Sequence, residues 1–268
     1  MPRSGRFVPV QPATSEQAVR SRRAGDPLPP RRLGCSGADV LPALRDLSRQ
    51  AVAHALARVV ALADGIAGGA KDPAEARVRV AAAACPGASW PVAVDGTAGN
   101  GHDTLFLARL VGEGGLVHAF DVQPEALART AARLAAEGLE ERAALHGRGH
   151  EELAAALGAH GGVSASSTRV AVGMFNLGFL PGSDRSVTTR SETTLTALEA
   201  LLPLMVPGGV ISLHVYAGHP GGADEAAALE ERFATLDWNC WRVARYEFAN
   251  KPRNPERLLL VSRLPGPA

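Results

Sequence analysis

The sequence has little cysteine, few aromatic side chains and no long apolar run. Its 268 residues include 3 cysteines, and aromatic residues make up 4% of the chain. Because Cys35, Cys85 and Cys240 are odd in number and widely spaced, they exclude a disulfide framework and a cysteine-rich zinc site. No apolar segment approaches the roughly 20 residues of a membrane-spanning helix. We therefore expect no membrane span and no bound metal.

The sequence also lacks a large net charge of either sign, since the formal charge is +1 at pH 7. Total charge therefore argues neither for nor against nucleic acid as a partner, and a basic binding surface would have to be local. A hydrophobic content of 46% is normal for a globular core, and the length suits one large α/β domain with appendages.

The first 34 residues differ in composition from the rest of the chain. They are rich in Pro and Ser, they lack a hydrophobic period, and Glu16 and Asp26 are their acidic residues. Their basic residues are Arg3, Arg6, Arg20, Arg22, Arg23, Arg31 and Arg32. This composition is typical of an organelle transit peptide, and a disordered basic tail has the same features. We expect residues 1–40 to be either a chloroplast or other organelle leader or the tail of a cytoplasmic protein.

A leading helix and an insertion are predicted before the core domain. The helix should run from about Leu41 to Ala63, because apolar residues recur on one of its faces. These residues are Leu44, Leu47, Val52, Leu56 and Val59 or Val60. The glycine-rich stretch from Gly65 to Ala76 indicates a flexible insertion. The expected organisation is thus a basic segment (1–40), a leading helix with an insertion (41–90) and a core domain (91–268).

Strands and helices alternate in the core domain. We predict strands at 91–96, 115–121, 143–147, 168–175 and 208–216, and helices near 103–112, 124–137, 151–157, 192–205 and 224–237. This alternation indicates a parallel sheet covered on both faces. Pro124 fits a first helical turn, and Pro207-Gly208-Gly209 reads as a helix stop after Met205. The final strands, "WRVARYEFAN" and "ERLLLVSRL", are joined only by "KPRNP", which is too short for a crossover, so they should form an antiparallel hairpin.

A glycine-rich turn, "DGTAGNGHD", links the first core strand to the first helix. Gly96, Gly99 and Gly101 allow positive φ angles and close backbone approach, and the following helix offers unpaired N–H groups. Asp121 ends the next strand about 20 residues later, which is the spacing that places a carboxylate on a ribose. Asp121 would serve equally as a strand-end turn residue. The pattern favours a nucleotide-like ligand.

The closing hairpin argues against a dinucleotide-binding fold, which has a second mononucleotide half. Five βα units followed by a hairpin resemble the class I S-adenosylmethionine methyltransferases. That resemblance implies a Rossmann-like, seven-stranded, mostly parallel sheet with a C-terminal antiparallel hairpin and helices on both faces. It also implies S-adenosylmethionine as cofactor. The residues expected to bind it are Asp95, as counter-charge to its cationic groups, Thr97, Gly99, Asn100, Gly101, Asp103, Asp121, Gln123, Gly149, His150 and Asn176.

The methyl acceptor should bind beyond the end of the fourth strand. Here Asn176-Leu177-Gly178-Phe179 stands where methylases of exocyclic base amines often have Asn-Pro-Pro-aromatic. The Asn176 amide oxygen would aim an amine, and the Phe179 ring would stack on a base. Asp184 or His219 would accept the amine proton, whereas His214 reads as a structural histidine. Each residue has an ordinary alternative: a loop cap for Asn176, a core position for Phe179 and a surface ion pair for Asp184 with Arg185.

Longer motifs resemble one family. They are "DGTAGNGHDTLFLA", "FDVQ", "GHEEL", "MFNLGFLPGSDRSVTT", "ETTLTALEALLPLMVPGGVISLHVYAGHPGG" and "FANKPRNPERLLLV". Together they are similar to the MnmM (TrmM, YtqB-like) tRNA methyltransferases, formerly described as rRNA methylases. The resemblance implies N-methylation of the aminomethyl group of 5-aminomethyl-2-thiouridine in the tRNA anticodon loop, and it favours a homodimer. Bacterial relatives usually have Ala in place of Gly96 and Ser in place of Gly149.

Tyr216, at the end of the fifth strand, is a candidate substrate-binding residue; the acceptor loop supplies Arg185 as another, and the hairpin loop supplies Lys251 and Arg253. With Arg190 they would form a phosphate-binding rim, although a solvated polar hairpin would have the same composition. Two other functions stay open at this point. The chain could methylate ribosomal RNA or a small molecule through the same cofactor site, or it could bind the cofactor as an assembly module without catalysis.

Overall fold

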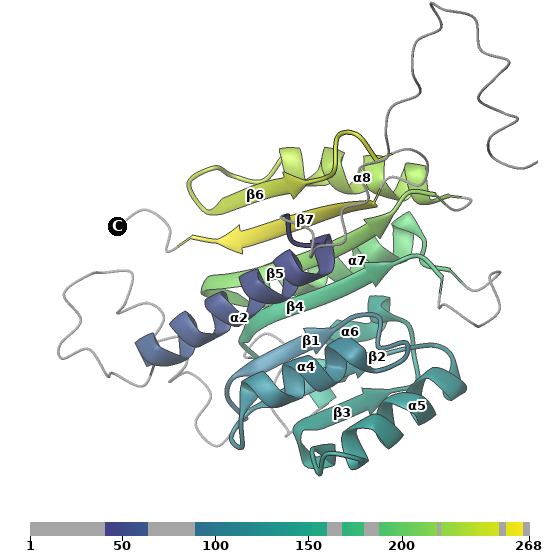
Figure 1. Ribbon diagram of the computed structural model, residues 1–268. Coiled ribbons are helices and arrows are strands. Elements are labelled where there is room, and N and C mark those ends of the chain that lie inside the picture. The colour runs from purple at the N-terminus through teal and green to yellow at the C-terminus, as the bar shows by residue number, and fades with distance from the viewer. Residues whose placement is uncertain are drawn as a thin grey trace, which may run out of the picture. The chain divides into compact units, whose positions relative to one another are not determined.

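The computed structural model describes residues 41–63, 89–159, 168–179, 188–218, 221–251 and 256–264. They lie in one compact unit, Leu41–Ala268, built on a seven-stranded sheet (Figure 1). The strands are β1 (Val92–Asp95), β2 (Leu116–Phe120), β3 (Ala143–His146), β4 (Val170–Leu177), β5 (Met205–Tyr216), β6 (Trp241–Tyr246) and β7 (Glu256–Arg263). The α-helices are α2 (Leu44–Ala63), α4 (His102–Val111), α5 (Pro124–Ala135), α6 (Leu153–Ala159), α7 (Ser191–Leu201) and α8 (Gly222–Ala234). Short 3-10 helices are η1 (Glu140–Arg142), η2 (His150–Glu152) and η5 (Leu202–Leu204).

The strand order is β3-β2-β1-β4-β5-β7-β6. Strands β1 to β5 pair in parallel, and β7 pairs antiparallel with both β5 and β6. The predicted Rossmann-like class I methyltransferase fold with its antiparallel C-terminal hairpin is therefore confirmed. The chain leaves β1 in one direction towards β2 and β3 and returns beside β1 as β4. This change of direction places a switch point between β1 and β4, where open α/β sheets bind their ligands.

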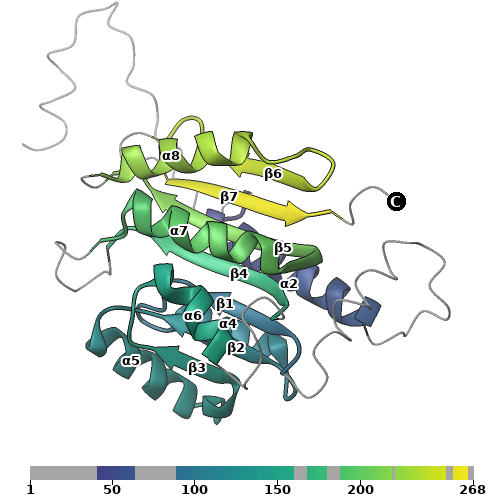
Figure 2. The same ribbon diagram turned by 180° about the vertical axis from the view of Figure 1, so that it is seen from behind.

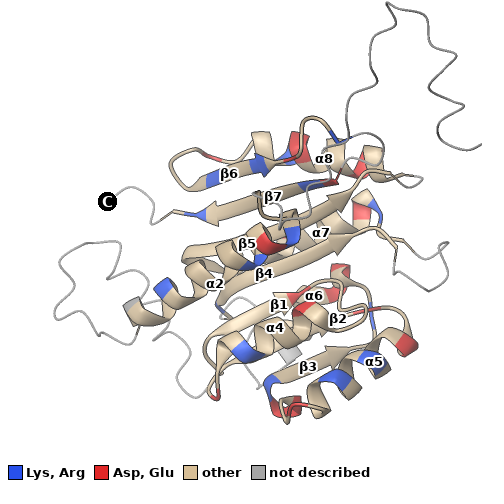
Figure 3. Ribbon diagram, viewed as in Figure 1, with Lys and Arg blue, Asp and Glu red and all other residues tan. Residues whose placement is uncertain are grey.

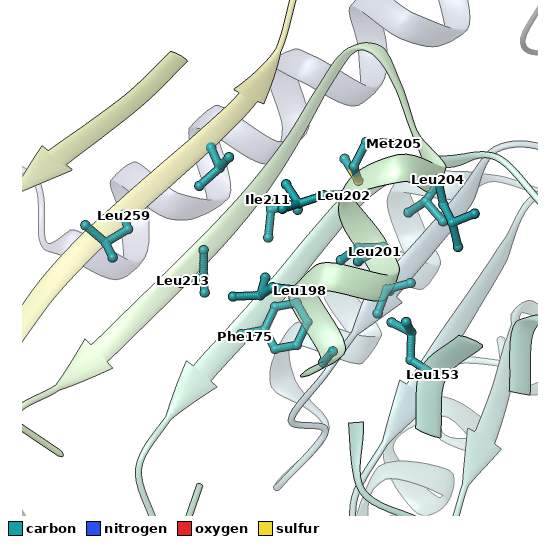
Figure 4. Close-up of a cluster of buried hydrophobic side chains, with 14 of the residues drawn as sticks. Leu153, Phe175, Leu198, Leu201, Leu202, Leu204, Met205, Ile211, Leu213 and Leu259 are labelled. Carbon is teal, nitrogen blue, oxygen red and sulfur yellow. The ribbon is translucent and has the colours of Figure 1, made fainter. Parts of the chain in front are cut away.

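Helices cover both faces of the sheet. Figure 1 shows the face with α2, α4 and α5, and Figure 2 shows the opposite face with α6, α7 and α8. Alternate residues of each strand point to opposite faces, so Val92 and Val94 join one buried cluster and Ala93 joins the other. Figure 4 shows the first cluster, in which Leu198 and Leu201 of α7 lie close to Phe175 of β4.

Helix α2 packs directly on the sheet. Its apolar face contributes Val52, Leu56 and Val59 to the second core cluster, as the sequence period predicts. A buried hydrogen bond of 2.6 Å joins the Ser48 and Ser212 hydroxyls, and it fixes the position of the helix along β5. The amino-terminal end of α2 consequently lies near the carboxyl end of β5 (Figure 1).

The segment Pro207-Gly208-Gly209 does not end a helix, and this prediction is wrong. Helix α7 ends at Leu201 and η5 follows, so the three residues lie inside β5. They form a bulge, because the ladder with β4 shifts between Val170 paired with Met205 and Val172 paired with Val210. Gly209 is required there, since a Cβ on it would lie 2.5 Å from the Ala171 carbonyl oxygen. A proline is tolerated at a bulge because the ladder bond is already missing.

The other predicted elements are present with small differences at their ends. Pro124 lies at the start of α5 as expected. Within the described residues, none of the helices has the length and apolar character required to cross a membrane.

Candidate functional site

The predicted site residues that the structure describes gather at the carboxyl edge of the parallel strands. Asp95 ends β1, Asp121 follows β2, and Gly149 follows β3. Asn176 lies near the end of β4 and Tyr216 ends β5. Because β1 and β4 are neighbours at the switch point, the glycine-rich turn and the Asn176 side chain share one crevice.

The turn after β1 is held in a fixed backbone conformation. Gly101 has a φ of 77° and caps α4, and a Cβ there would lie 2.8 Å from the Thr130 backbone. Helix α5 clamps the same turn: the Thr130 hydroxyl donates to the Gly99 carbonyl at 3.3 Å and Arg133 Nε donates to the Asn100 carbonyl at 2.9 Å. Only glycine fits at position 101, because the turn and α5 approach each other so closely there.

Asp121 connects two turns at the crevice. Its Oδ2 accepts the Gly99 N–H at 2.9 Å, and its Oδ1 accepts the Gln123 N–H, also at 2.9 Å. The residue is only partly buried. Each carboxylate oxygen has a second lone pair, so Asp121 can still accept two hydrogen bonds from a ligand such as a ribose diol.

Asp95 is fully buried, which differs from the expected direct counter-charge. Its Oδ1 accepts the Thr97 N–H at 3.1 Å, and its Oδ2 accepts the Thr104 hydroxyl at 2.6 Å. Burial, with a smaller contribution from the Asp103 charge, raises the pKa of Asp95 to about 7. Asp95 therefore stabilises the turn through these two hydrogen bonds. Its carboxyl group is only partly ionised at neutral pH.

Thr97 links the glycine turn to the acceptor strand. Its Oγ1 accepts the backbone N–H of Asn176 at 2.7 Å, and the Gly96 N–H donates to the Met174 carbonyl at 2.9 Å. The threonine hydroxyl satisfies the Asn176 N–H of β4 just beyond the last pair with β1, Asp95 with Met174.

The Asn176 side chain has a defined orientation. Its Nδ2 donates to Asp103 Oδ2 at 2.7 Å. A carboxylate accepts hydrogen bonds and does not donate them, so the amide nitrogen must face Asp103 and the amide oxygen must face away. Asp103 is in turn held by Arg49 of α2, whose Nη2 and Nε donate to Asp103 Oδ1 at 2.6 and 3.0 Å. Asn176 thus offers one acceptor oxygen at the crevice.

His150 is buried behind the turn and does not line its open side. Its Nδ1 donates to the Gly96 carbonyl at 3.0 Å, and its Nε2 lies 3.4 Å from the Thr194 hydroxyl. Thr194 and Thr189 both donate to the buried Glu225, at 2.7 and 2.8 Å. Burial lowers the pKa of His150, so the ring is neutral. This network joins η2, the start of α7 and α8 beneath the crevice.

A second polar cluster lies on β5 and β7 beside Asn176. His214 pairs with Asn176 in the β4–β5 ladder, and its Nε2 lies 3.1 Å from Glu256 Oε2. The Tyr216 ring stacks on His214 with centroids 4.4 Å apart, and Tyr216 is 42% exposed. Lys251 forms an ion pair with Glu256. Burial lowers the pKa of His214, which agrees with its expected structural role, while Tyr216 presents an aromatic face to solvent.

Several predicted residues lie outside the described part of the chain: Asp184, Arg185, His219 and Arg253. Phe179 and Gly149 are described, and both are partly buried at the carboxyl edge. Phe179 forms an isolated bridge with Thr188. Among the described residues, no cluster of His, Cys, Asp or Glu is arranged to hold a metal ion.

Sequence reasoning missed Arg49, Glu225 and Glu256. Arg49 lies 54 positions before its partner Asp103, and no local motif links two residues so far apart. Glu256 and Glu225 resemble ordinary surface acids at the start of a strand and a helix. The burial of Glu225 and the partners of both residues become visible only when the sheet is assembled.

Comparison with known proteins shows the family of this chain. A family model described as "Putative rRNA methylase" matches residues 117–262. A curated relative from Arabidopsis thaliana, named tRNA (mnm(5)s(2)U34)-methyltransferase, chloroplastic, is 36% identical over 178 residues. Those residues are 63% of this chain, and this chain spans 62% of that relative's length.

Solved structures of methylases are also similar to this chain. A putative rRNA-methylase from Clostridium thermocellum is 36% identical with a TM-score of 0.59, and the match covers 65% of this chain and 88% of that one. A putative methyltransferase from Streptococcus mutans, solved in complex with S-adenosylhomocysteine (SAH), is 26% identical with a TM-score of 0.63, covering 84% and 100%. An rRNA methylase from Streptococcus thermophilus is 28% identical with a TM-score of 0.59, covering 84% and 98%. The chain belongs to the family described as "Putative rRNA methylase".

Proposed function

We propose that this protein is an S-adenosylmethionine-dependent tRNA methyltransferase that acts on the aminomethyl group of 5-aminomethyl-2-thiouridine at the wobble position. One observation carries the proposal: at the switch point, the glycine turn lies directly beside an asparagine whose amide oxygen faces outward from a carboxylate. That arrangement suits transfer to an amine. The names of the Arabidopsis relative and of the Streptococcus mutans structure, which holds the demethylated cofactor, support the substrate and the cofactor.

The residues at the crevice fit S-adenosylmethionine. The Gly99 to Gly101 backbone packs closely on α5, because a Cβ on Gly101 would meet Thr130, and this fixed turn is the part that we propose holds the cofactor. Asp121 has free lone pairs for ribose hydroxyls. The exposed Val122 and the partly buried Gln123 and Gly149 lie where the base would be held. When bound, S-adenosylmethionine supplies a methyl group that is already activated by the positive sulfur.

The protein residues then have to align and desolvate the acceptor amine. A free alkylamine has a pKa of about 10 and attacks only after losing a proton. Asn176 Oδ1 accepts a hydrogen bond from the neutral amine, which holds its lone pair towards the methyl group. Alignment of this kind contributes several kcal/mol to a displacement reaction. Asp184 and His219, which lie outside the described residues, remain our proposed proton acceptors.

The carboxyl edge also carries the proposed tRNA contacts. Lys251 and the Tyr216 ring are exposed there, and the Arg190 side chain is exposed at the start of α7. Positive and negative residues are interspersed over α8 and the β6–β7 pair (Figure 3). The rim is therefore small and local, in keeping with recognition of one anticodon loop through phosphates and a stacked base.

The compartment and the assembly are also proposals. The Arabidopsis relative is named as chloroplastic, and the basic first 34 residues have a transit-like composition. We propose a chloroplast location and a homodimeric assembly.

A second candidate is methylation of ribosomal RNA, which the family description and the Streptococcus thermophilus protein favour by name. The test is a direct comparison of substrates. The purified protein with methyl-labelled S-adenosylmethionine should label tRNA that carries 5-aminomethyl-2-thiouridine, and it should leave ribosomal RNA unlabelled. Label in ribosomal RNA alone would contradict the tRNA assignment and support methylation of ribosomal RNA.

A further inference from the structure

We infer that Arg49, on the leading helix, is a positioning residue for methyl transfer that acts on Asn176 through Asp103. This inference rests on the proposed function. It assigns a part in the reaction to α2, which lies before the cofactor motifs in the sequence.

The contacts form an unbroken chain across three elements. Arg49 donates twice to Asp103 Oδ1, at 2.6 and 3.0 Å, and the Asn176 amide donates to Asp103 Oδ2 at 2.7 Å. Each bond is charge-assisted, and such bonds are shorter and stronger than neutral ones. The two oxygens of one carboxylate therefore couple a guanidinium on α2 to an amide on β4.

The Arg49 side chain makes further contacts with α4. Its Nη2 also donates to the His102 carbonyl at 3.2 Å, and its guanidinium carbon lies 5.1 Å from the Phe106 ring centre. The preceding residue, Ser48, is anchored to Ser212 by a buried hydrogen bond. The side chain is thus held by α4, and the helix that carries it is anchored on the sheet, as is required of a residue that orients another.

Without Arg49, the Asp103 carboxylate would lose both donors that fix its Oδ1. The carboxylate could then rotate, and the Asn176 amide that it holds could turn its nitrogen towards the acceptor. A nitrogen donor in that position repels the amine hydrogens. Arg49 therefore keeps the acceptor oxygen of Asn176 pointing towards the substrate.

The test compares Arg49→Met with Arg49→Lys and with Arg58→Met as a matched control. Met retains the packing on Phe106 without charge, and Lys retains the charge. Arg58 is an exposed arginine further along the same helix. Single-turnover transfer with saturating tRNA and cofactor should fall about tenfold in Arg49→Met and less in Arg49→Lys, with dissociation constants for tRNA and SAH changed less than about twofold. Arg58→Met should match the wild type.

A double-mutant cycle with Asn176→Ala separates positioning from general structural damage. If Arg49 acts through Asn176, Arg49→Met should cause no further slowing in the Asn176→Ala protein. A further tenfold loss there, a wild-type rate in Arg49→Met, or weakened tRNA binding would each overturn the inference.

A measurement without substrate keeps the inference distinct from the proposed function. In protein labelled with ¹⁵N-asparagine, the Asn176 side-chain amide should give a slowly exchanging resonance, identified by its loss in Asn176→Ala. Arg49→Met should shift it or speed its exchange, and Arg58→Met should not. An unchanged resonance overturns the inference, whereas a wild-type protein that does not methylate this tRNA, with the resonance behaving as expected, overturns the proposed function alone.

Discussion

The Thr97 hydroxyl accepts the backbone N–H of Asn176 at 2.7 Å. This single bond joins the turn after β1 to the end of β4, which are 79 residues apart in the chain. The turn proposed to bind the cofactor and the residue proposed to orient the acceptor are consequently joined at one edge of the sheet. Movement of the turn would move Asn176 as well, so binding at the turn and alignment by Asn176 are mechanically linked.

The buried Asp95 predicts a specific dependence of stability on pH. Its pKa is raised from 3.8 to about 7, chiefly by burial. A carboxyl with a raised pKa favours folding at low pH, and this contribution is lost as the pH rises from about 4 to about 7. Three pKa units correspond to roughly 4 kcal/mol. Asp95→Asn removes this loss, because an amide does not ionise.

Urea unfolding of the wild type and of Asp95→Asn at about pH 5 and about pH 8 measures this effect. The variant should gain stability relative to the wild type on going to the higher pH, with a gain on the order of 2 to 4 kcal/mol. If the difference in unfolding free energy between the wild type and Asp95→Asn were the same at both pH values, Asp95 would be ionised in the folded protein throughout this range.

Gly96 provides the space for the Phe175 ring. A Cβ on Gly96 would lie 2.1 Å from the nearest ring carbon, so the present position of the ring requires glycine here. We expect Gly96→Ala to lower the free energy of unfolding by about 1 to 3 kcal/mol. Gly147→Ala is a suitable control, because its Cβ would meet the Leu127 side chain at an ordinary 3.5 Å.

The same contact predicts compensation. Because Phe175→Leu removes the ring, Gly96→Ala should cost less in that background than in the wild type, as chemical denaturation of the four proteins would measure. Additive losses would show that the Gly96 site is constrained by something other than the Phe175 ring.

Asp121 should control cofactor affinity. Asp121→Ala removes the acceptor of the Gly99 and Gln123 N–H groups and of the proposed ribose hydroxyls, so the dissociation constant for SAH should rise at least about tenfold. Titration calorimetry measures it directly. Glu125→Gln changes an exposed acid at the start of α5 and should bind as the wild type does. If Asp121→Ala retained wild-type affinity, the ribose would have to lie elsewhere.

Lys251 should contribute to tRNA binding through charge. It lies exposed at the carboxyl edge and is paired with Glu256. Lys251→Ala should raise the tRNA KM and reduce the slope of log affinity against log salt by about one, as for one lost phosphate contact. Arg58→Ala, on the distant part of α2, should leave the slope unchanged. If Lys251→Ala and Arg58→Ala gave the same salt dependence of tRNA affinity, Lys251 would not contact a tRNA phosphate.

Sequence periodicity predicted the strands, the helices and the hairpin, because each depends on residues close together in the chain. The bulge at Pro207-Gly208-Gly209 was misread as a helix stop, since proline and glycine mark both features and only the β4–β5 pairing distinguishes them. Motifs indicated Thr97, Asp121 and Asn176 as site residues, and the structure brings all three to one edge. Arg49 could not be found in this way, because its contact with Asp103 depends on how α2 packs across the sheet.

The central claim is that Asn176 aims an amine of tRNA at an activated methyl group. The most direct test is single-turnover methylation of tRNA that carries 5-aminomethyl-2-thiouridine, by the wild type and by Asn176→Ala, with nucleosides resolved by mass spectrometry. The account predicts label in the methylaminomethyl nucleoside with the wild type. It predicts a rate about 100-fold lower with Asn176→Ala when S-adenosylmethionine and tRNA are both saturating. Equal rates in the two proteins, or no label in this nucleoside with the wild type, would contradict it.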